Sequence, residues 1–256
     1  MDDCNSIRFL IAAALGAGIT VSGCRRAPPP PPPPPVIQWQ APTSAAAAFS
    51  PPVRGGAIAG QVIYTGPPVK AAVMVSRVSA ARVTDETITV NPDGTLCNVL
   101  VYVKTGLENR SFPPATKTLV IDARGTTFDP HVLGVQVGQP ILARNCDPDP
   151  HVFHFIPNKN AERNTPIAPS APGAAFSFTT MELGIRLKDD IDPCLAAWIC
   201  VLPLPFFNVT NSAGVYRLED LPPGTYVIET WHEKLGSKQQ TVTVTDGQVS
   251  RVDIRY

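Results

Sequence analysis

The sequence predicts an all-β protein built as an antiparallel β-sandwich. From Val53 onward Val and Thr are abundant, turn residues recur at short intervals, and no stretch keeps the 3.6-residue period of an amphipathic helix. The roughly 200 residues from Val53 to Tyr256 suffice for one large or two small domains with cores of their own.

Each expected strand is an apolar or β-branched run, and in most cases a turn signal ends it. The expected strands cover residues 57–64, 87–90, 97–103, 118–122, 132–137, 141–143, 215–218, 225–231, 240–245 and 249–254. The turn signals are Gly66-Pro67-Pro68, Asn91-Pro92-Asp93-Gly94, Gly138 with Pro140, Asn211 to Gly214, Leu221-Pro222-Pro223-Gly224 and Asp246-Gly247. Two of them, at Asn91 to Gly94 and at Asp246-Gly247, are typical of hairpins.

The first 23 residues predict a lipoprotein signal peptide. Arg8 precedes an apolar run from Phe9 to Val21 that is short for a membrane span. The run ends in Val21-Ser22-Gly23-Cys24, which resembles a lipobox, so cleavage would leave Cys24 lipidated at the new N-terminus. The alternative is an ordinary signal peptide with an incidental cysteine. Lipidation predicts a protein of the bacterial cell envelope, anchored to a membrane through Cys24 and facing the periplasm or the exterior.

Residues 24–52 are expected to be the lipidated cysteine followed by a disordered linker. Pro28 to Pro35 are eight consecutive prolines, which favour a stiff polyproline II spacer, and Ala45 to Ala48 continue the low complexity. The formal net charge is zero, with 21 basic and 21 acidic residues, and no basic run follows the linker. Nucleic acid is therefore not an expected partner.

The stretch from Phe128 to Phe155 holds three of the four histidines and carries a family resemblance. Asn145-Cys146-Asp147 followed by Pro150-His151 resembles the first-histidine loop of cupredoxins, the small blue-copper β-sandwiches. Pro130 to Val135 with Val137-Gly138 is similar to bacterial plastocyanin-like envelope proteins of the methylamine-utilisation type, which also carry carboxypeptidase-regulatory-like segments.

A second resemblance lies in the C-terminal third. Gly214 through His232 resembles the carboxypeptidase-regulatory, transthyretin-like sandwich, with its Leu-Pro-Pro-Gly-x-Tyr and Trp-His-Glu motifs, and Gly56 to Pro68 resembles the opening strand of that module. The two resemblances imply a cupredoxin-like sandwich at residues 53–205, opening strand included, merged with a carboxypeptidase-regulatory-like segment at 206–256. Whether one module is inserted into the other or fused to it stays open at this point.

The resemblance also implies a degenerate type-1 copper site. The family supplies a histidine first and then cysteine, histidine and methionine in one loop, which here is Lys188 to Leu195. Asp189 stands at the cysteine position, Asp192 at the second histidine and Leu195 at the methionine, so His151 alone remains. Because carboxylates are hard donors, this set disfavours a copper electron-transfer site.

Two interpretations of this loop remain. His151, Asp189 and Asp192 are an adequate donor set for another divalent metal such as zinc or manganese. Alternatively, the aspartates are solvated and His151 is hydrogen-bonded in a loop. His154 is not expected to join them, because residues three apart in a strand point to opposite faces.

Four cysteines follow the linker, an even number that predicts disulfides in an oxidising compartment. Cys97, Cys146, Cys194 and Cys200 allow three pairings. We expect Cys194 with Cys200 and Cys97 with Cys146.

No nucleophile elbow, HExxH motif or phosphate-binding glycine loop follows the linker, so we do not expect an enzyme. The first hypothesis is a non-catalytic envelope module that needs no cofactor and binds a protein, a glycan or a small ligand through the loops around His151 and Lys188 to Leu195. The second is a metal-binding redox or carrier protein that uses His151 to hold copper, zinc or manganese. A third, an enzyme, has only the family's association with oxidative metabolism behind it.

Overall fold

The computed structural model describes residues 55–256, so the predicted signal peptide, Cys24 and linker lie outside the described residues. Nineteen strands form in this part of the chain, and most neighbouring strands pair antiparallel. The prediction of an all-β sandwich architecture is confirmed. Between residues 55 and 256 there is no helix with the length and apolar character needed to cross a membrane.

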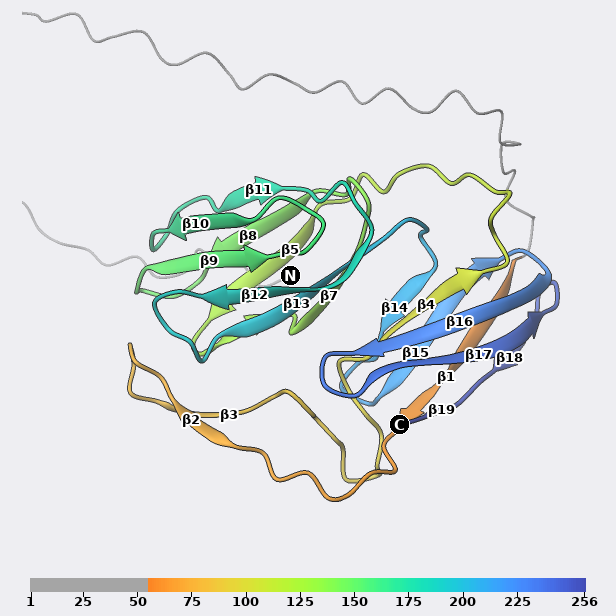
Figure 1. Cartoon of the computed structure of the whole chain (residues 1–256), viewed down its shortest axis with the longest axis horizontal. Helices are drawn as coiled ribbons and strands as arrows, with labels where there is room; N and C mark the ends of the chain where they lie inside the picture. The colour runs from red at the N-terminus through yellow and green to blue at the C-terminus, as the bar shows by residue number, and fades with distance from the viewer. Residues whose placement is uncertain (1–54) are drawn as a thin grey trace, which may run out of the picture. The chain divides into compact units, whose positions relative to one another are not determined.

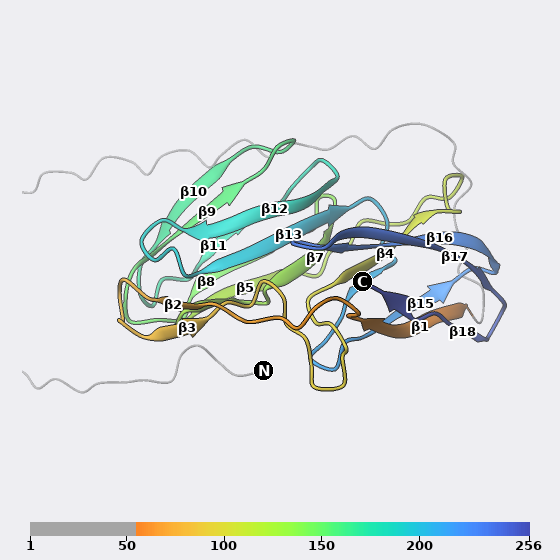
Figure 2. The same ribbon diagram turned by 60° about the horizontal axis from the view of Figure 1, so that its bottom comes forward.

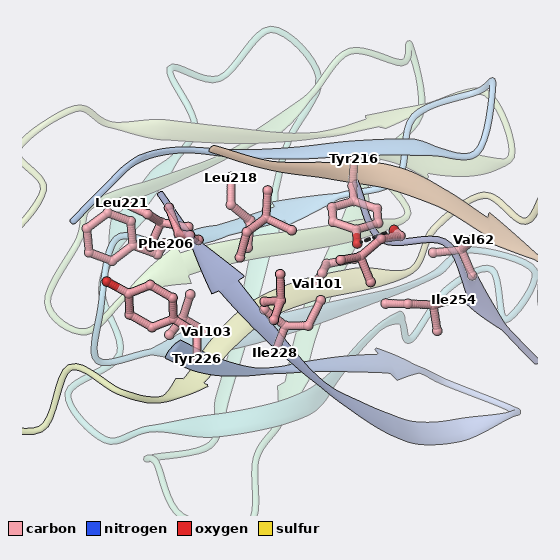
Figure 3. Packing of buried hydrophobic residues seen from close by; sticks show 14 of the residues in the cluster. Val62, Val101, Val103, Phe206, Tyr216, Leu218, Leu221, Tyr226, Ile228 and Ile254 are labelled. Atoms are coloured by element: carbon pink, nitrogen blue, oxygen red, sulfur yellow. Dashed lines mark hydrogen bonds between the residues drawn. The ribbon is translucent and has the colours of Figure 1, made fainter. Parts of the chain in front are cut away.

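The first of two sandwiches is built from both ends of the described chain, and we call it the split sandwich. One of its sheets has the order β15-β1-β18, with β19 also pairing with β1, and the other has the order β14-β4-β16-β17. Its strands are β1 (Gly56–Ile63), β4 (Leu100–Thr105), β14 (Phe207–Val209), β15 (Val215–Leu221), β16 (Gly224–His232), β17 (Gly236–Val244), β18 (Val249–Arg251) and β19 (Ile254–Arg255). Figure 3 shows Val62, Val101, Leu218, Ile228 and Ile254 among the side chains that fill the space between these sheets.

The second sandwich, the inserted sandwich, uses the chain between β4 and β14. Its sheets have the orders β10-β9-β12-β13-β7 and β11-β8-β5-β6 (Figure 1). Its strands are β5 (Leu119–Arg124), β6 (Thr127–Asp129), β7 (Val132–Gln136), β8 (Ile141–Asn145), β9 (His151–Ile156), β10 (Arg163–Ile167), β11 (Ala174–Phe176), β12 (Glu182–Asp189) and β13 (Ala196–Leu202). A second apolar core, rich in phenylalanine and including Phe128, Phe153 and Phe155, lies between the two sheets.

The strand pairing answers the question of insertion against fusion. β1 and β4 pair with strands that follow residue 206, and everything from β5 to β13 is inserted between β4 and β14. This differs from the predicted division at 205/206, which placed the opening strand with the cupredoxin-like part. The physical reason is burial, because Ile58 and Val62 are fully buried in the core of the split sandwich.

A smaller apolar cluster joins the two sandwiches. Leu100 and Tyr102 of β4 are buried together with Val132 and Cys200 of the inserted sandwich. Trp198 and Trp231, one from each sandwich, make an edge contact with ring centroids 5.9 Å apart. The two sandwiches therefore share buried apolar surface.

Residues 66–89 form a hairpin arm that the sequence pattern does not predict. Its strands β2 (Val73–Val75) and β3 (Arg82–Thr84) pair only with each other (Figure 2). Val73 and Val75 are more than half exposed, whereas Val83 is buried. The predicted strand at residues 87–90 is reduced to an isolated bridge between Val90 and Leu96.

Candidate functional site

The side chain of His151 lies between two carboxylates at the start of β9. Its Nδ1 is 2.7 Å from Asp189 Oδ2, and its Nε2 is 3.0 Å from Asp147 Oδ2. The His151 side chain is only 3% exposed, Asp189 is fully buried, and Asp147 is 14% exposed. Both nitrogens of the imidazole are thus engaged, as expected of an imidazolium held by two carboxylates.

Backbone groups fix the position of Asp189 at the end of β12. Its carboxylate accepts hydrogen bonds from the backbone nitrogens of Val152 at 2.8 Å, Ile191 at 3.1 Å and Asp192 at 3.2 Å. Burial alone would raise the pKa of Asp189, but these bonds and the His151 contact outweigh it and lower that pKa below its ordinary value.

The pKa of His151 is set by a similar balance. Burial disfavours the imidazolium, but the hydrogen bonds to Asp189 and Asp147 outweigh burial, so the pKa of His151 is raised. Through its contacts with Asp147 and Asp189, His151 links the loop after β8 to the end of β12.

Asp192 is buried but belongs to a different contact. The hydroxyl of Ser76 in the hairpin arm donates to Asp192 Oδ2, and the backbone nitrogens of Cys194 and Arg77 donate to Oδ1 at 3.2 and 3.4 Å. Asp192 therefore holds the hairpin arm against the loop between β12 and β13.

These contacts test the predicted metal site at His151, Asp189 and Asp192. A metal would need a bare nitrogen on His151, yet a carboxylate faces each ring nitrogen, and the Asp192 carboxylate bonds to the arm instead. Across residues 55–256 no group of three or more His, Cys, Asp or Glu side chains is arranged to hold a metal ion. The contacts of His151 and Asp192 therefore do not fit a metal site formed by His151, Asp189 and Asp192.

The remaining histidines have separate partners. His154 lies on the opposite face of β9, as predicted, and contacts Asp190 at 3.0 Å and Glu162 at 2.6 Å near the surface. His131 bonds to Glu233 of the Trp-His-Glu motif. The ring Nδ1 of His232 accepts hydrogen bonds from two backbone nitrogens, and burial lowers its pKa to about 4. These contacts give His232 a structural role at the end of β16.

Neither predicted disulfide bridge is present, because Cys97, Cys194 and Cys200 are free thiols. Cys200 lies inside β13 and Cys194 lies in the turn before it, and the extended chain from Ala196 to Cys200 alone spans about 13 Å, beyond the reach of a disulfide. The thiol of Cys97 instead contacts the Ser212 carbonyl at 3.7 Å, and Asn91 Nδ2 lies 3.5 Å from its sulfur.

Two partners in this site, Asp147 and Ser76, are not among the residues predicted from the sequence. Asp147 lies four residues before His151 in the same loop, so its position was a signal that could have been used. Ser76 is 116 residues from Asp192 and lies in a segment without a strong strand pattern. Nothing local in the sequence connects those two residues.

Comparison with known proteins gives one family and a set of weak structural matches. Residues 206–256 match the model of the carboxypeptidase regulatory-like domain family. No curated protein matches the chain.

The structural matches cover about a third of the chain. An oxidised point mutant of amicyanin has 18% identity and a TM-score of 0.30 over 33% of this chain and 82% of its own. A purple cupredoxin from Nitrosopumilus maritimus has 17% identity and a TM-score of 0.27 over 33% and 99%. A copper-containing nitrite reductase from Thermus scotoductus has 18% identity and a TM-score of 0.31 over 38% and 25%.

Replacing Ser76 with alanine is expected to loosen the hairpin arm. The change removes a hydroxyl donor from the buried Asp192 carboxylate, which costs about 1–3 kcal/mol. Trypsin should then cleave faster at Arg77 and Arg82, both exposed in the arm. Ser79→Ala is the control, because Ser79 is exposed and its hydroxyl accepts only a local bond. Equal cleavage rates for the two variants would contradict the role of the Ser76 contact.

The His151 pair also predicts a pH dependence. Because the folded pKa of His151 is raised, its contribution is fully present below about pH 6.5, the unfolded value, and is lost as pH rises through the folded pKa. The Asp189 contribution, with a lowered pKa, is lost only as pH falls through acid values. The difference in unfolding free energy between the native protein and His151→Gln should therefore shrink above pH 6.5. His232, whose pKa is lowered, gives stability the opposite pH dependence, but it is present in both proteins and cancels in the difference. A difference that grows with pH would contradict the raised pKa of His151.

Proposed function

We propose that the protein is a non-catalytic lipoprotein of the bacterial cell envelope that acts as a binding module. In its cupredoxin-like sandwich, an ion-pair network of His151 with Asp147 and Asp189 takes the place of a metal site. The observation that carries the proposal is the engagement of both ring nitrogens of His151 by Asp147 and Asp189. The Asp192 carboxylate accepts a hydrogen bond from Ser76 and so does not join His151 in a ligand set.

The placement in the envelope is supported by the lipobox-like Val21-Ser22-Gly23-Cys24 and the proline run that follows it. A lipid at Cys24 and a stiff spacer would hold the folded part away from a membrane surface, where it would meet an envelope protein or a glycan. Incorporation of labelled palmitate into the native chain but not into Cys24→Ser would support this placement. Equal labelling of both would overturn it.

The metal content of the protein tests whether ion pairs around His151 stand in place of a metal. It is measured by mass spectrometry together with a visible absorption spectrum. The full chain is produced by export and offered copper, zinc and manganese in turn. We expect less than stoichiometric metal, no blue thiolate band, and the same result for His151→Gln. Stoichiometric metal that disappears in His151→Gln would overturn the proposal and favour a metal carrier or redox protein.

A further inference from the structure

Two arginines flank an alanine on the outer face of the sheet β15-β1-β18. Ala59 of β1 pairs with Arg217 of β15 on one side and with Arg251 of β18 on the other. Residues paired across a sheet share one face, and Tyr216 and Leu218, the neighbours of Arg217, are buried on the opposite face. Both arginines are exposed, with their Cα atoms on the order of 10 Å apart across two strand spacings.

These arginines line a groove of 820 Å³. Its lining includes Ala59, Gln61, Asn208, Asn211, Arg217 and Arg251. The small side chain of Ala59 leaves its floor low, and the amides of Gln61 and Asn208 add hydrogen-bonding groups. Asn211 adds its amide NH2 group, because its Oδ1 already accepts from the backbone nitrogens of Ala213 and Val215. The groove thus combines two guanidinium groups with side-chain amides.

The acids near this groove neutralise it only in part. Arg217 Nε lies 2.7 Å from Glu219 Oε1, but both side chains are about half exposed or more, so a ligand carboxylate can compete for this arginine. Asp253 is engaged by the backbone nitrogen of Gln61 at 2.9 Å. Arg251 is exposed, and none of the ion pairs found within residues 55–256 involves it.

We propose that this groove binds a linear acidic glycan, whose carboxylates contact Arg217 and Arg251 and whose hydroxyls contact the amides. The planar fork of a guanidinium matches a carboxylate with two parallel hydrogen bonds, and side-chain amides both donate to and accept from hydroxyls. A nucleic acid is a poorer fit, because stacking needs an exposed aromatic ring and Tyr216, the aromatic residue of the lining, is 3% exposed. The inference specifies the ligand of the proposed binding function and does not depend on the His151 site.

The test is calorimetric binding of tetragalacturonate to the full chain, with neutral maltotetraose as the comparison ligand. We expect the acidic oligomer to bind and the neutral one not to. Arg251→Gln should weaken binding by about tenfold, and the double variant Arg217→Gln, Arg251→Gln by more. Both positions are exposed, so an unchanged unfolding midpoint would show that the fold is intact.

The matched control is Arg255→Gln. Arg255 is exposed on β19, in pairing with the same strand β1, but does not line the groove. Unchanged affinity in this variant supports the groove, whereas an equal loss indicates attraction by general positive charge and overturns it. Absence of tetragalacturonate binding, or displacement of it by equimolar sulfate, would also overturn the glycan assignment while leaving the metal-content result unaffected.

Discussion

Replacing His151 with glutamine is expected to lower the free energy of unfolding by roughly 3–5 kcal/mol, the usual cost of removing one partner from a buried ion pair. Glutamine cannot supply the positive charge that Asp189 and Asp147 share, and Asp189 is fully buried. The backbone bonds to Asp189 remain, which places the expected loss toward the lower end of that range. Chemical denaturation followed by tryptophan fluorescence measures the change.

The chain provides its own control for this prediction. His154 lies three residues away in the same strand, and it too contacts two carboxylates, but its partner Glu162 is 65% exposed. His154→Gln should therefore cost no more than about 1 kcal/mol, as solvent-exposed pairs do. If the two substitutions cost the same, burial of the His151 pair is not the source of its stability.

The sequence predicts ten of the nineteen strands between residues 55 and 256, because alternation and turn chemistry are local signals. It misses β6 and all strands from β9 to β14, as well as the two strands of the arm. The hairpin turn at Asn91 to Gly94 forms, with the backbone nitrogen of Gly94 donating to Asn91 at 2.9 Å. The arm strands β2 and β3 have three residues each and offer too short a pattern to detect. Local pattern also cannot tell which distant strands pair, which is why insertion and fusion stayed open.

The sequence predicts where the candidate site lies better than it predicts what the residues of that site bind. His151 and Asp189 do meet, because both lie at the same end of the paired strands β9 and β12. Whether a carboxylate binds a metal or a histidine depends on what else reaches the ring. Here that is Asp147, whose backbone nitrogen donates to Asn145 Oδ1 at 2.8 Å. The groove lined by Arg217 and Arg251 could not be predicted from the sequence for another reason. It depends on the pairing register of three strands, and a one-residue change in register would put either arginine on the other face of the sheet.

Gly60 marks the place where the sequence of β1 departs from simple alternation. Ile58 and Val62 point into the core of the split sandwich, and Gly60 occupies the inward position between them. The chain between β18 and β19 crosses there, and the carbonyl oxygen of Val252 lies 1.7 Å from where a Cβ on residue 60 would be. Tyr216 donates to the same carbonyl at 2.7 Å and helps to fix it (Figure 3).

Gly60→Ala is therefore expected to lower the free energy of unfolding by at least the roughly 1–3 kcal/mol typical of overpacking, since a backbone carbonyl yields less readily than a side chain. To admit the methyl group, β1 must separate from β18 and β19, so the loss should be accompanied by faster hydrogen exchange at the backbone nitrogens of Val252 and Tyr256, which donate to β1. Gly224→Ala is the matched control, because the nearest atom to its new Cβ is the Tyr226 hydroxyl at 3.3 Å, a much milder contact than the 1.7 Å at Gly60. Native stability of Gly60→Ala would mean that β1 does not lie between β15 and β18, and the insertion of one sandwich into the other would have to be abandoned.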